Sequence, residues 1–150
     1  MSLKDRLVED MKAAMKAKEE GKVRLSVIRM ARAAIKNSEI DKKQEFNDEQ
    51  VIEVLAREVK MRRDAIAEFT KAERPEKVKE LEEEIAVLME YLPQQLSEGE
   101  IRRLAQETIQ SVGAQGPKDL GKVMGALTPK TKGRADGKLV NQIVRELLGS

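Results

Sequence analysis

The chain of 150 residues contains no cysteine and no histidine. Without cysteine it can form no disulfide, no zinc–thiolate site and no thiol nucleophile. Without histidine it lacks the commonest general base and the commonest metal ligand. No serine lies in a glycine-flanked turn of the kind that presents a hydrolase nucleophile. We therefore predict no catalytic residue, no metal site and no cofactor.

Aromatic residues are nearly absent as well: they make up 2% of the chain and are Phe46, Phe69 and Tyr91. A core built from Leu, Ile, Val, Met and Ala favours helices over a sheet, in which aromatic and β-branched residues are enriched. No apolar run approaches the roughly 20 residues of a membrane span, and the N-terminus lacks the apolar region of a signal peptide. We expect no membrane partner and a cytoplasmic location.

Charge is plentiful but unevenly distributed. Charged residues make up 37% of the chain, and their net charge is only +2. Between Lys118 and Arg145 there are seven cations and two anions, a net charge of +5 that leaves −3 for the remainder of the chain. This concentration of basic residues favours an anionic partner for the C-terminal part.

Apolar residues recur every three or four positions along most of the chain, which predicts amphipathic helices. Asn47 with Gln50, and Ser97 with Glu100, have the spacing of capping boxes at helix starts. Pro75 has the place of a first helical residue. The expected helices cover, in chain order, residues 3–20, 23–43, 51–71, 75–92, 98–112, 117–128 and 136–148.

These elements predict an all-α fold in two parts. Short connections between the long helices favour antiparallel hairpins. We expect an N-terminal bundle of about four long helices over residues 1–93 and a small three-helix C-terminal domain over residues 94–150. The segment LPQQLSEGE, which begins at Leu92, marks the boundary.

Two charged clusters on the long helices have both structural and functional interpretations. The carboxylates of the fourth helix are interpreted as a solvated face supported by Lys77 and Lys79, with acid–base chemistry as the alternative. The basic residues of the third helix are interpreted as an exposed face balanced by neighbouring acids, with an acidic partner as the alternative. These clusters are Glu80, Glu82, Glu83, Glu84 and Glu90, and Lys60, Arg62 and Arg63.

The segment GKVMGALTPKTKGRADGKLV, residues 121–140, is rich in both glycine and lysine. Gly121 and Gly125 lie four residues apart, and we interpret them as positions where two helices pack closely, with ligand approach as the alternative. We expect the sixth helix to end before Pro129 and a loop to follow. No phosphate-binding loop of the Walker type precedes the Gly-Lys pair.

The loop itself suits a phosphate backbone. Glycine lets a backbone approach a phosphate closely, and lysine and arginine supply the counter-charge. Asp136 is placed to cap the last helix, whose N-terminus adds partial positive charge. The loop and helix start combine Gly133 and Gly137 with Lys130, Lys132, Arg134 and Lys138.

The same residues carry a resemblance to a known family. DLGKVMGALTPKTKGRADGKLVNQIV, with EYLPQQLSEGEI upstream, resembles the YqeY family, and SLKDRLVEDMKAAMKAKE and LSVIRM extend the resemblance over the whole chain. YqeY proteins are related to the tail domain of GatB, the B subunit of the tRNA-dependent amidotransferase. The resemblance implies an all-helical fold and contact with the elbow of tRNA, around the D-loop.

Carried over by position, the resemblance implies RNA-binding residues and a structural motif around them. The implied RNA-binding residues are Lys122, Lys130, Lys132, Arg134 and Lys138. The implied structural motif consists of Gly121, Gly125, Pro129, Gly133, Asp136 and Gly137.

Three functional hypotheses remain open at this point. The first is a non-catalytic RNA-binding module for tRNA, and the scarcity of aromatic residues favours recognition by shape and charge over base stacking. The second is an amidotransferase activity, or an accessory role in one, of the carbon–nitrogen ligase type with glutamine as amide donor; no residue pattern in the sequence supports that chemistry. The third is an adaptor that binds a protein partner in tRNA metabolism.

Overall fold

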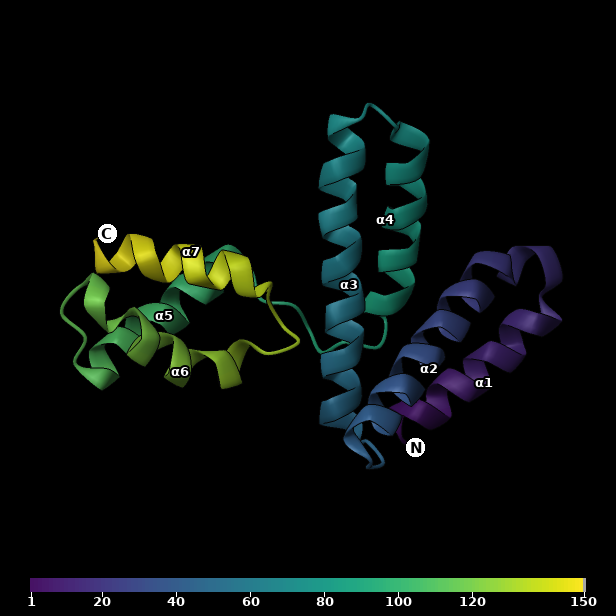
Figure 1. Cartoon of the computed structure of the whole chain (residues 1–150), viewed down its shortest axis with the longest axis horizontal. Coiled ribbons are helices and arrows are strands. Elements are labelled where there is room, and N and C mark those ends of the chain that lie inside the picture. The colour runs from purple at the N-terminus through teal and green to yellow at the C-terminus, as the bar shows by residue number, and fades with distance from the viewer. Residues whose placement is uncertain (150) are drawn as a thin grey trace. The chain divides into compact units, whose positions relative to one another are not determined.

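The computed structural model describes residues 1–149, and Ser150 lies outside the described residues. Within residues 1–149 the chain forms seven α-helices and no strand, which confirms the predicted all-α class (Figure 1). The helices are α1 (Leu3–Lys16), α2 (Lys22–Lys42), α3 (Asp48–Lys71), α4 (Pro75–Met89), α5 (Glu98–Val112), α6 (Leu120–Thr131) and α7 (Gly137–Leu148). Two 3₁₀ turns, η1 (Lys18–Gly21) and η2 (Pro117–Asp119), precede α2 and α6.

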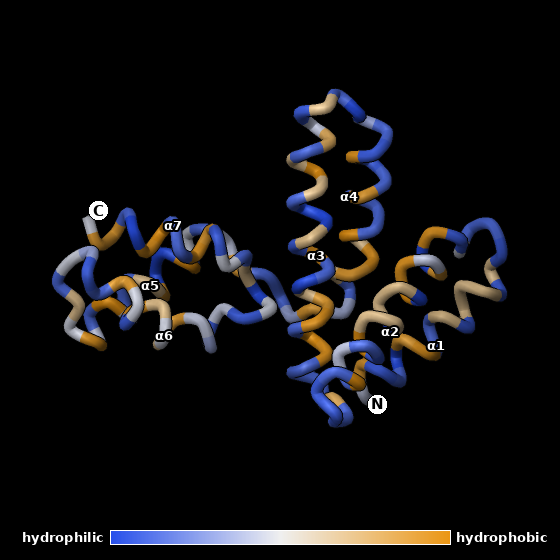
Figure 2. Tube along the Cα trace, in the orientation of Figure 1, coloured by the Kyte–Doolittle hydropathy of each residue, from blue (hydrophilic) through white to orange (hydrophobic). Residues whose placement is uncertain are grey.

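The chain divides into two compact units, Met1–Leu92 (unit 1) and Pro93–Ser150 (unit 2). Each unit has a hydrophobic core of its own, and the two cores share no residue. Apolar residues recur along each helix between polar ones, as the colours in Figure 2 show. This alternation lets each helix bury one face and leave the other to solvent.

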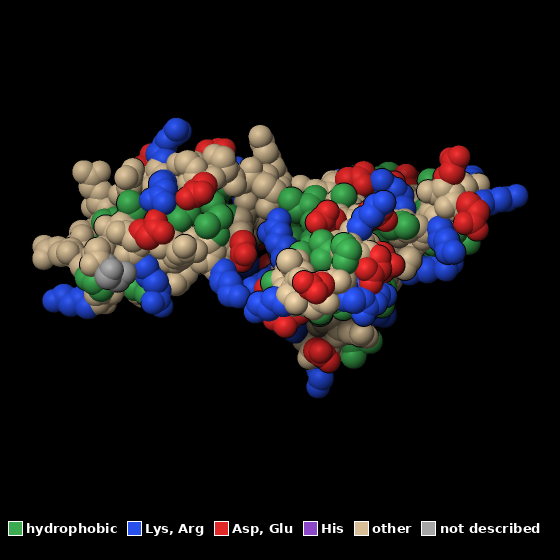
Figure 3. Space-filling model, turned by 90° about the horizontal axis from the view of Figure 1, so that it is seen from above, with side chains coloured by type: hydrophobic (Ala, Val, Ile, Leu, Met, Phe, Trp, Pro, Cys, Tyr) green, Lys and Arg blue, Asp and Glu red, His purple; other side chains and the backbone are tan. Residues whose placement is uncertain are grey.

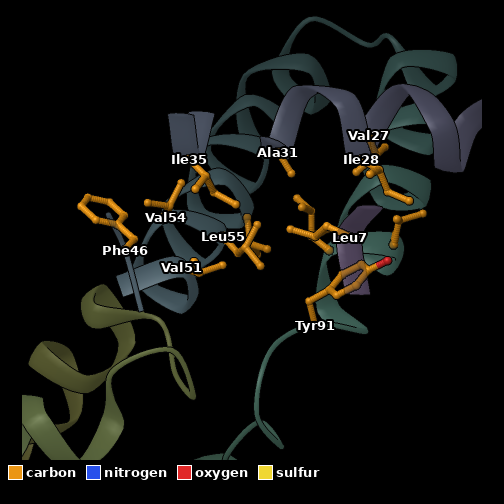
Figure 4. Packing of buried hydrophobic residues seen from close by; sticks show 13 residues of the cluster. Leu7, Val27, Ile28, Ala31, Ile35, Phe46, Val51, Val54, Leu55 and Tyr91 are labelled. Carbon is orange, nitrogen blue, oxygen red and sulfur yellow. The ribbon is translucent and has the colours of Figure 1, made fainter. Parts of the chain in front are cut away.

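Unit 1 consists of two helical hairpins. α1 lies beside α2, and α3 lies beside α4 with a short turn between them (Figure 1). Leu7, Ile28, Leu55 and Leu88, one from each helix, are fully buried where the hairpins meet. Figure 4 shows how the aliphatic side chains of this core point toward one another. The core needs few aromatic residues because branched aliphatic side chains of four helices fill it.

The predicted helix starts are confirmed in detail. Asn47 accepts a hydrogen bond from the amide of Gln50 at 3.0 Å, and the Gln50 side chain accepts one from the Asn47 amide at 3.0 Å. Ser97 and Glu100 form the same reciprocal pair at the start of α5. Each box satisfies amide groups that the first helical turn leaves without partners.

The first helix ends at Lys16 and not at about residue 20 as expected, because Lys18 turns the chain with a left-handed φ of +54°. Gly21 follows at the end of this turn. It is buried at the turn between α1 and α2, where a Cβ atom would lie 2.2 Å from the carbonyl oxygen of Ala14. No real Cβ tolerates that distance from backbone. The glycine therefore lets the two helices of the first hairpin approach closely at this point.

Three further expectations about helix ends and faces were wrong. α6 continues through Pro129 to Thr131, because a proline in the last turn removes only one hydrogen bond, the one that would reach the carbonyl of Gly125. α4 ends at Met89, four residues before Pro93. Arg62 is not on an exposed face but is buried between α3 and α4.

Arg62 joins the two helices of the second hairpin through an ion pair with Glu84 and also pairs with Glu58 on its own helix. Its Nε lies 2.9 Å from a carboxylate oxygen of Glu84 on α4, and its Nη1 lies 3.1 Å from one of Glu58 on α3. Glu84 is therefore not part of a purely solvated acidic face. A guanidinium group can serve both carboxylates because its donors form a planar fork.

The end of α4 is held by a polar cluster inside unit 1. The Tyr91 hydroxyl donates to the Asp10 carboxylate, and the Arg6 guanidinium lies 4.8 Å from the centre of the Tyr91 ring. Burial, followed by the hydrogen bond to Asp10, raises the pKa of Tyr91. An ion pair of 2.7 Å between Arg24 and Glu90 joins α2 to the same end of α4.

Unit 2 is a three-helix arrangement in which α5, α6 and α7 each pack against the other two. Ile101, Val123, Leu127 and Ile143 are among its fully buried side chains. Gly113, with a φ of +68°, ends α5 in the left-handed conformation that glycine adopts without strain. This small core positions the segment that joins α6 to α7.

Candidate functional site

The predicted RNA-binding residues lie at the C-terminal half of unit 2, on α6, α7 and the turn between them. Lys122 and Lys130 are on α6, and Lys132 is its C-cap. Arg134 is in the turn, and Lys138 is in the first turn of α7. The expected loop is thus shorter than residues 129–137, since its first three residues continue α6.

The turn between α6 and α7 is fastened to the segment before α5. The Leu96 amide donates to the carbonyl of Arg134 at 2.8 Å, and the Gln95 side-chain amide donates to the carbonyl of Gly133 at 2.8 Å. In return, Arg134 Nε donates to the carbonyl of Gln94 at 3.2 Å. These three hydrogen bonds, which we call the 94–134 clamp, hold the turn in one conformation.

Gly133 is the residue that allows the turn to form. Its φ is +74°, in the left-handed region where a side chain would be strained. Three residues later, Asp136 caps α7 as predicted, because its Oδ1 accepts the Lys138 amide at 3.0 Å. The first turn of α7 contains no acidic residue, so among the residues at this end of the helix only the Asp136 cap offsets the partial positive charge of the helix N-terminus.

Gly121 and Gly125 correct the interpretation of close helix packing. Both are exposed, and a Cβ atom at either position would meet nothing within 4 Å. They lie four residues apart, and Pro129 continues the same spacing, so the three form one outward stripe on α6. The stripe leaves the helix backbone open to an approaching partner.

Exposed cations occur on α6 itself and on the turn and helix that follow it. Lys122, Lys130 and Lys138 are exposed, and none of them forms an ion pair with any other residue from 1 to 149. Arg134 is half-buried because its guanidinium takes part in the clamp. Lys132 is exposed at the end of α6. Three lysines are therefore available to an anionic partner beside an open stretch of backbone.

The acidic residue nearest in sequence to the stripe, Asp119, accepts a local backbone hydrogen bond, and the charges of Lys122 and Lys118 also lower its pKa. Asp119 accepts the Gln115 amide at 2.9 Å, and that hydrogen bond is the main reason why the pKa of Asp119 is lowered. Its carboxylate thus stabilises the turn before η2. Lys118, which the prediction did not include, is exposed beside it and adds a further cation at the start of α6.

Sequence reasoning missed the residues that fasten the turn. Gln95 and Gly133 are separated by 38 residues, and Gln94 and Arg134 by 40. Local patterns report spacing along one helix or turn, so they contain no signal for a contact between such distant segments.

Charge of both signs is also present outside the basic turn. Figure 3 shows Lys and Arg side chains interspersed with Asp and Glu on the face in view. Across residues 1–149, no group of three or more acidic side chains is arranged to hold a metal ion. No helix in the described part of the chain is both long and apolar enough to cross a membrane.

The fold and the basic turn together define a small all-helical protein whose three-helix C-terminal unit presents lysines beside an open helix backbone. The model of the YqeY family, described as Yqey-like protein, matches residues 4–148. The chain therefore belongs to the YqeY family, as the resemblance predicted.

Comparison with characterised proteins found relatives of two kinds. The first are two fungal proteins named Altered inheritance of mitochondria protein 41, mitochondrial. The one from Pyrenophora tritici-repentis is 29% identical over 97% of this chain and 80% of its own length. The one from Kluyveromyces lactis is 41% identical over 57% of this chain and 45% of its own length. The cytoplasmic location stays a prediction for this chain.

The second kind of relative belongs to an amidotransferase. The E subunit of the glutamyl-tRNA(Gln) amidotransferase from Thermococcus sibiricus is 42% identical over 34% of this chain, a stretch that covers 9% of that protein's length. The expected relationship to the tRNA-dependent amidotransferases is thus found, through the E subunit. Because the shared stretch is so small a part of that protein, its activity as a whole does not transfer with the similarity.

Proposed function

We propose that unit 2 is a non-catalytic module that binds the phosphate backbone of tRNA. The observation that carries the proposal is that Lys122 and Lys130 of α6 and Lys138 in the first turn of α7 are exposed and form no ion pair within residues 1–149, while α6 also carries exposed glycines. Cations supply the counter-charge, and helix backbone without side chains permits close approach.

The composition of unit 2 favours recognition of RNA by its backbone and shape over recognition by base stacking. All three aromatic residues of the chain, Phe46, Phe69 and Tyr91, belong to unit 1. Unit 2 can therefore not stack bases on aromatic rings, which is how single-stranded RNA is usually held. A folded RNA, recognised through its backbone and its shape, fits this surface better.

The choice of tRNA among folded RNAs rests on the amidotransferase relative. That protein is named for glutamyl-tRNA(Gln), and the shared stretch is 55 residues long. The resemblance noted above further points to the tRNA elbow. The proposed contacts on this chain are Lys122, Lys130, Lys132 and Lys138, with Arg134 holding the turn through its bond to Gln94.

Charge reversal of Lys130 and Lys138 tests the proposal. Binding of fluorescein-labelled tRNA is measured by anisotropy over a range of salt concentrations. We expect Lys130→Glu with Lys138→Glu to weaken binding at least about tenfold, and to flatten the dependence of log affinity on log salt by roughly 0.7 to 0.9 for each phosphate that the variant no longer neutralises. Arg134 is left unchanged, so that the clamp stays intact.

A matched control uses two exposed cations of unit 1. Arg57→Glu with Lys60→Glu on α3 changes the net charge equally and should leave tRNA affinity within about twofold. Circular dichroism should show unchanged helical content in both double variants. Equal binding by wild type and the unit 2 variant, or an equal loss in the α3 control, would overturn the proposal.

A second candidate function, an accessory or stand-alone role in amide transfer, is favoured by the similarity to the amidotransferase relative. Purified protein is incubated with Glu-tRNA, glutamine and ATP, and glutamate release is measured. The first proposal expects no glutamate release by the protein alone. If glutamate is released only when the protein is present, the second proposal replaces the first.

A further inference from the structure

Unit 1 presents an apolar row on a face of α2 that no other helix of that unit covers. Met30 is 42% exposed and Ile40 is 61% exposed. Ala33 is exposed between them, and the spacings of three and seven residues place all three on one side of the helix. The exposed Asn37 lies on the same side between Ala33 and Ile40, so the row has one polar gap. Large apolar side chains that share one exposed helix face can mark a contact with another molecule.

A groove runs beside this row, between α1 and α2. It has a volume of about 500 Å³, and Leu7, Val8, Ala33 and Ile35 contribute its apolar lining. Ala33 thus belongs to both the row and the groove. The two features form one continuous surface, which we call the α2 face.

A line of cations follows the same side of α2. Arg29, Arg32 and Lys36, at positions i, i+3 and i+7, all line the groove and extend over roughly 10 Å of helix. None of them forms an ion pair within residues 1–149; Arg32 donates only to the sulfur of Met11, at 3.3 Å. The charge of Lys36 also lowers the pKa of Glu39, and the charges of Arg29 and Arg32 are available to a partner.

The acidic residues of the groove are engaged at one end of it. Glu39 accepts Lys4 Nζ at 2.7 Å and the Phe46 amide at 2.7 Å, and these bonds, that from Lys4 first, hold its pKa below the ordinary value. Glu45 lies 3.7 Å from the same lysine. They close one end of the groove and leave the cationic line open along the rest.

We infer that the α2 face binds an acidic amphipathic helix of a partner protein. The apolar row would pack against an apolar stripe of the partner helix. The cationic line would pair with carboxylates at i, i+3 and i+7 on the flank of that stripe. A helix satisfies both because its side chains repeat with the same spacing as those of α2. An RNA backbone would leave Met30 and Ile40 without apolar partners.

The test uses a synthetic helical peptide of about 18 residues, five turns. It carries leucines along one stripe and glutamates at i, i+3 and i+7 beside it, and its binding to the full chain is measured by fluorescence anisotropy. Arg29→Glu with Lys36→Glu should weaken binding at least about tenfold, because both charge pairs are lost. Met30→Ser with Ile40→Ser should weaken it about three- to tenfold, because apolar area stays exposed.

Control variants on α3 match each change. Lys60→Glu with Arg63→Glu repeats the charge reversal, and Met61→Ser removes a methionine that is 57% exposed. Neither should change the affinity for the peptide by more than about twofold. A second peptide with lysine in place of each glutamate should bind at least about tenfold more weakly.

Four outcomes would overturn the inference: no binding of the acidic peptide, equal binding of the lysine peptide, no effect of the α2 variants, or equal effects of the α3 controls. A dimer in sedimentation that Met30→Ser with Ile40→Ser dissociates would assign the face to a second copy instead. Loss of tRNA binding in Arg29→Glu with Lys36→Glu would assign it to RNA. Because the inference concerns unit 1, its failure leaves the proposal for unit 2 standing.

Discussion

Single glycines in this chain have opposite roles that their sequence context does not distinguish. Gly21 and Gly125 both lie beside apolar residues of helical spacing. In the structure, a Cβ atom at Gly21 would lie 2.2 Å from the Ala14 carbonyl oxygen, whereas one at Gly125 would meet nothing within 4 Å. The first glycine is needed for packing. The second weakens a helix that has room for a side chain, so its presence there calls for another explanation, such as the approach of a partner.

Alanine substitution at these two positions should therefore change stability in opposite directions. Gly21→Ala should destabilise the chain by about 2 to 4 kcal/mol, since backbone must move to admit the methyl group. Gly125→Ala should stabilise unit 2 by about 0.5 to 1 kcal/mol, since alanine restricts the unfolded chain and favours the helix. Urea unfolding monitored by circular dichroism measures both. Destabilisation by Gly125→Ala would restore the interpretation of close packing.

At the scale of elements, the two helices of the second hairpin in unit 1 are joined by charge as well as by apolar packing. Arg62 of α3 pairs with Glu84 of α4, and the Arg62 side chain is only 9% exposed. The run of acids on α4 and the basic run on α3 thus meet at one buried point. The sequence shows both runs but not that they face each other, because the facing depends on how the hairpin closes.

Removal of this arginine should be costly because it leaves two partly buried carboxylates without a partner. We expect Arg62→Met to lower the free energy of unfolding by about 2 to 3 kcal/mol at neutral pH, less than a fully buried pair would lose. Arg63→Met, at the exposed neighbouring position, should change it by less than about 0.5 kcal/mol. Chemical denaturation gives both values. A loss at Arg62 as small as that at Arg63 would mean that the ion pairs behave as surface pairs.

At the scale of the whole molecule, the chain has two cores and two candidate binding surfaces, one of each in each unit. The core of unit 1 and the core of unit 2 share no residue. The 94–134 clamp, which shapes the basic turn, lies entirely within unit 2. Every hydrogen bond of the clamp on which the proposed RNA surface depends is therefore made inside that unit.

We accordingly expect a fragment that begins at Pro93 to fold and bind tRNA by itself. Its circular dichroism should show helices that unfold cooperatively in urea, with low stability, because so short a chain buries little apolar surface. Its tRNA affinity should lie within about threefold of that of the full chain. A fragment that stays unfolded would show that unit 2 needs unit 1. A folded fragment that fails to bind would show that RNA contacts extend beyond unit 2.

The sequence alone determined the helical class, the capping boxes at Asn47 and Ser97, the concentration of lysine after residue 118 and the family. These features depend on local spacing and composition, which the chain shows directly. Tertiary structure decided which glycine is packed and which is open, that Arg62 is buried, and that Gln94 and Gln95 hold the turn at Gly133. Each of these depends on residues that are far apart in the chain and that only the packing of helices brings together.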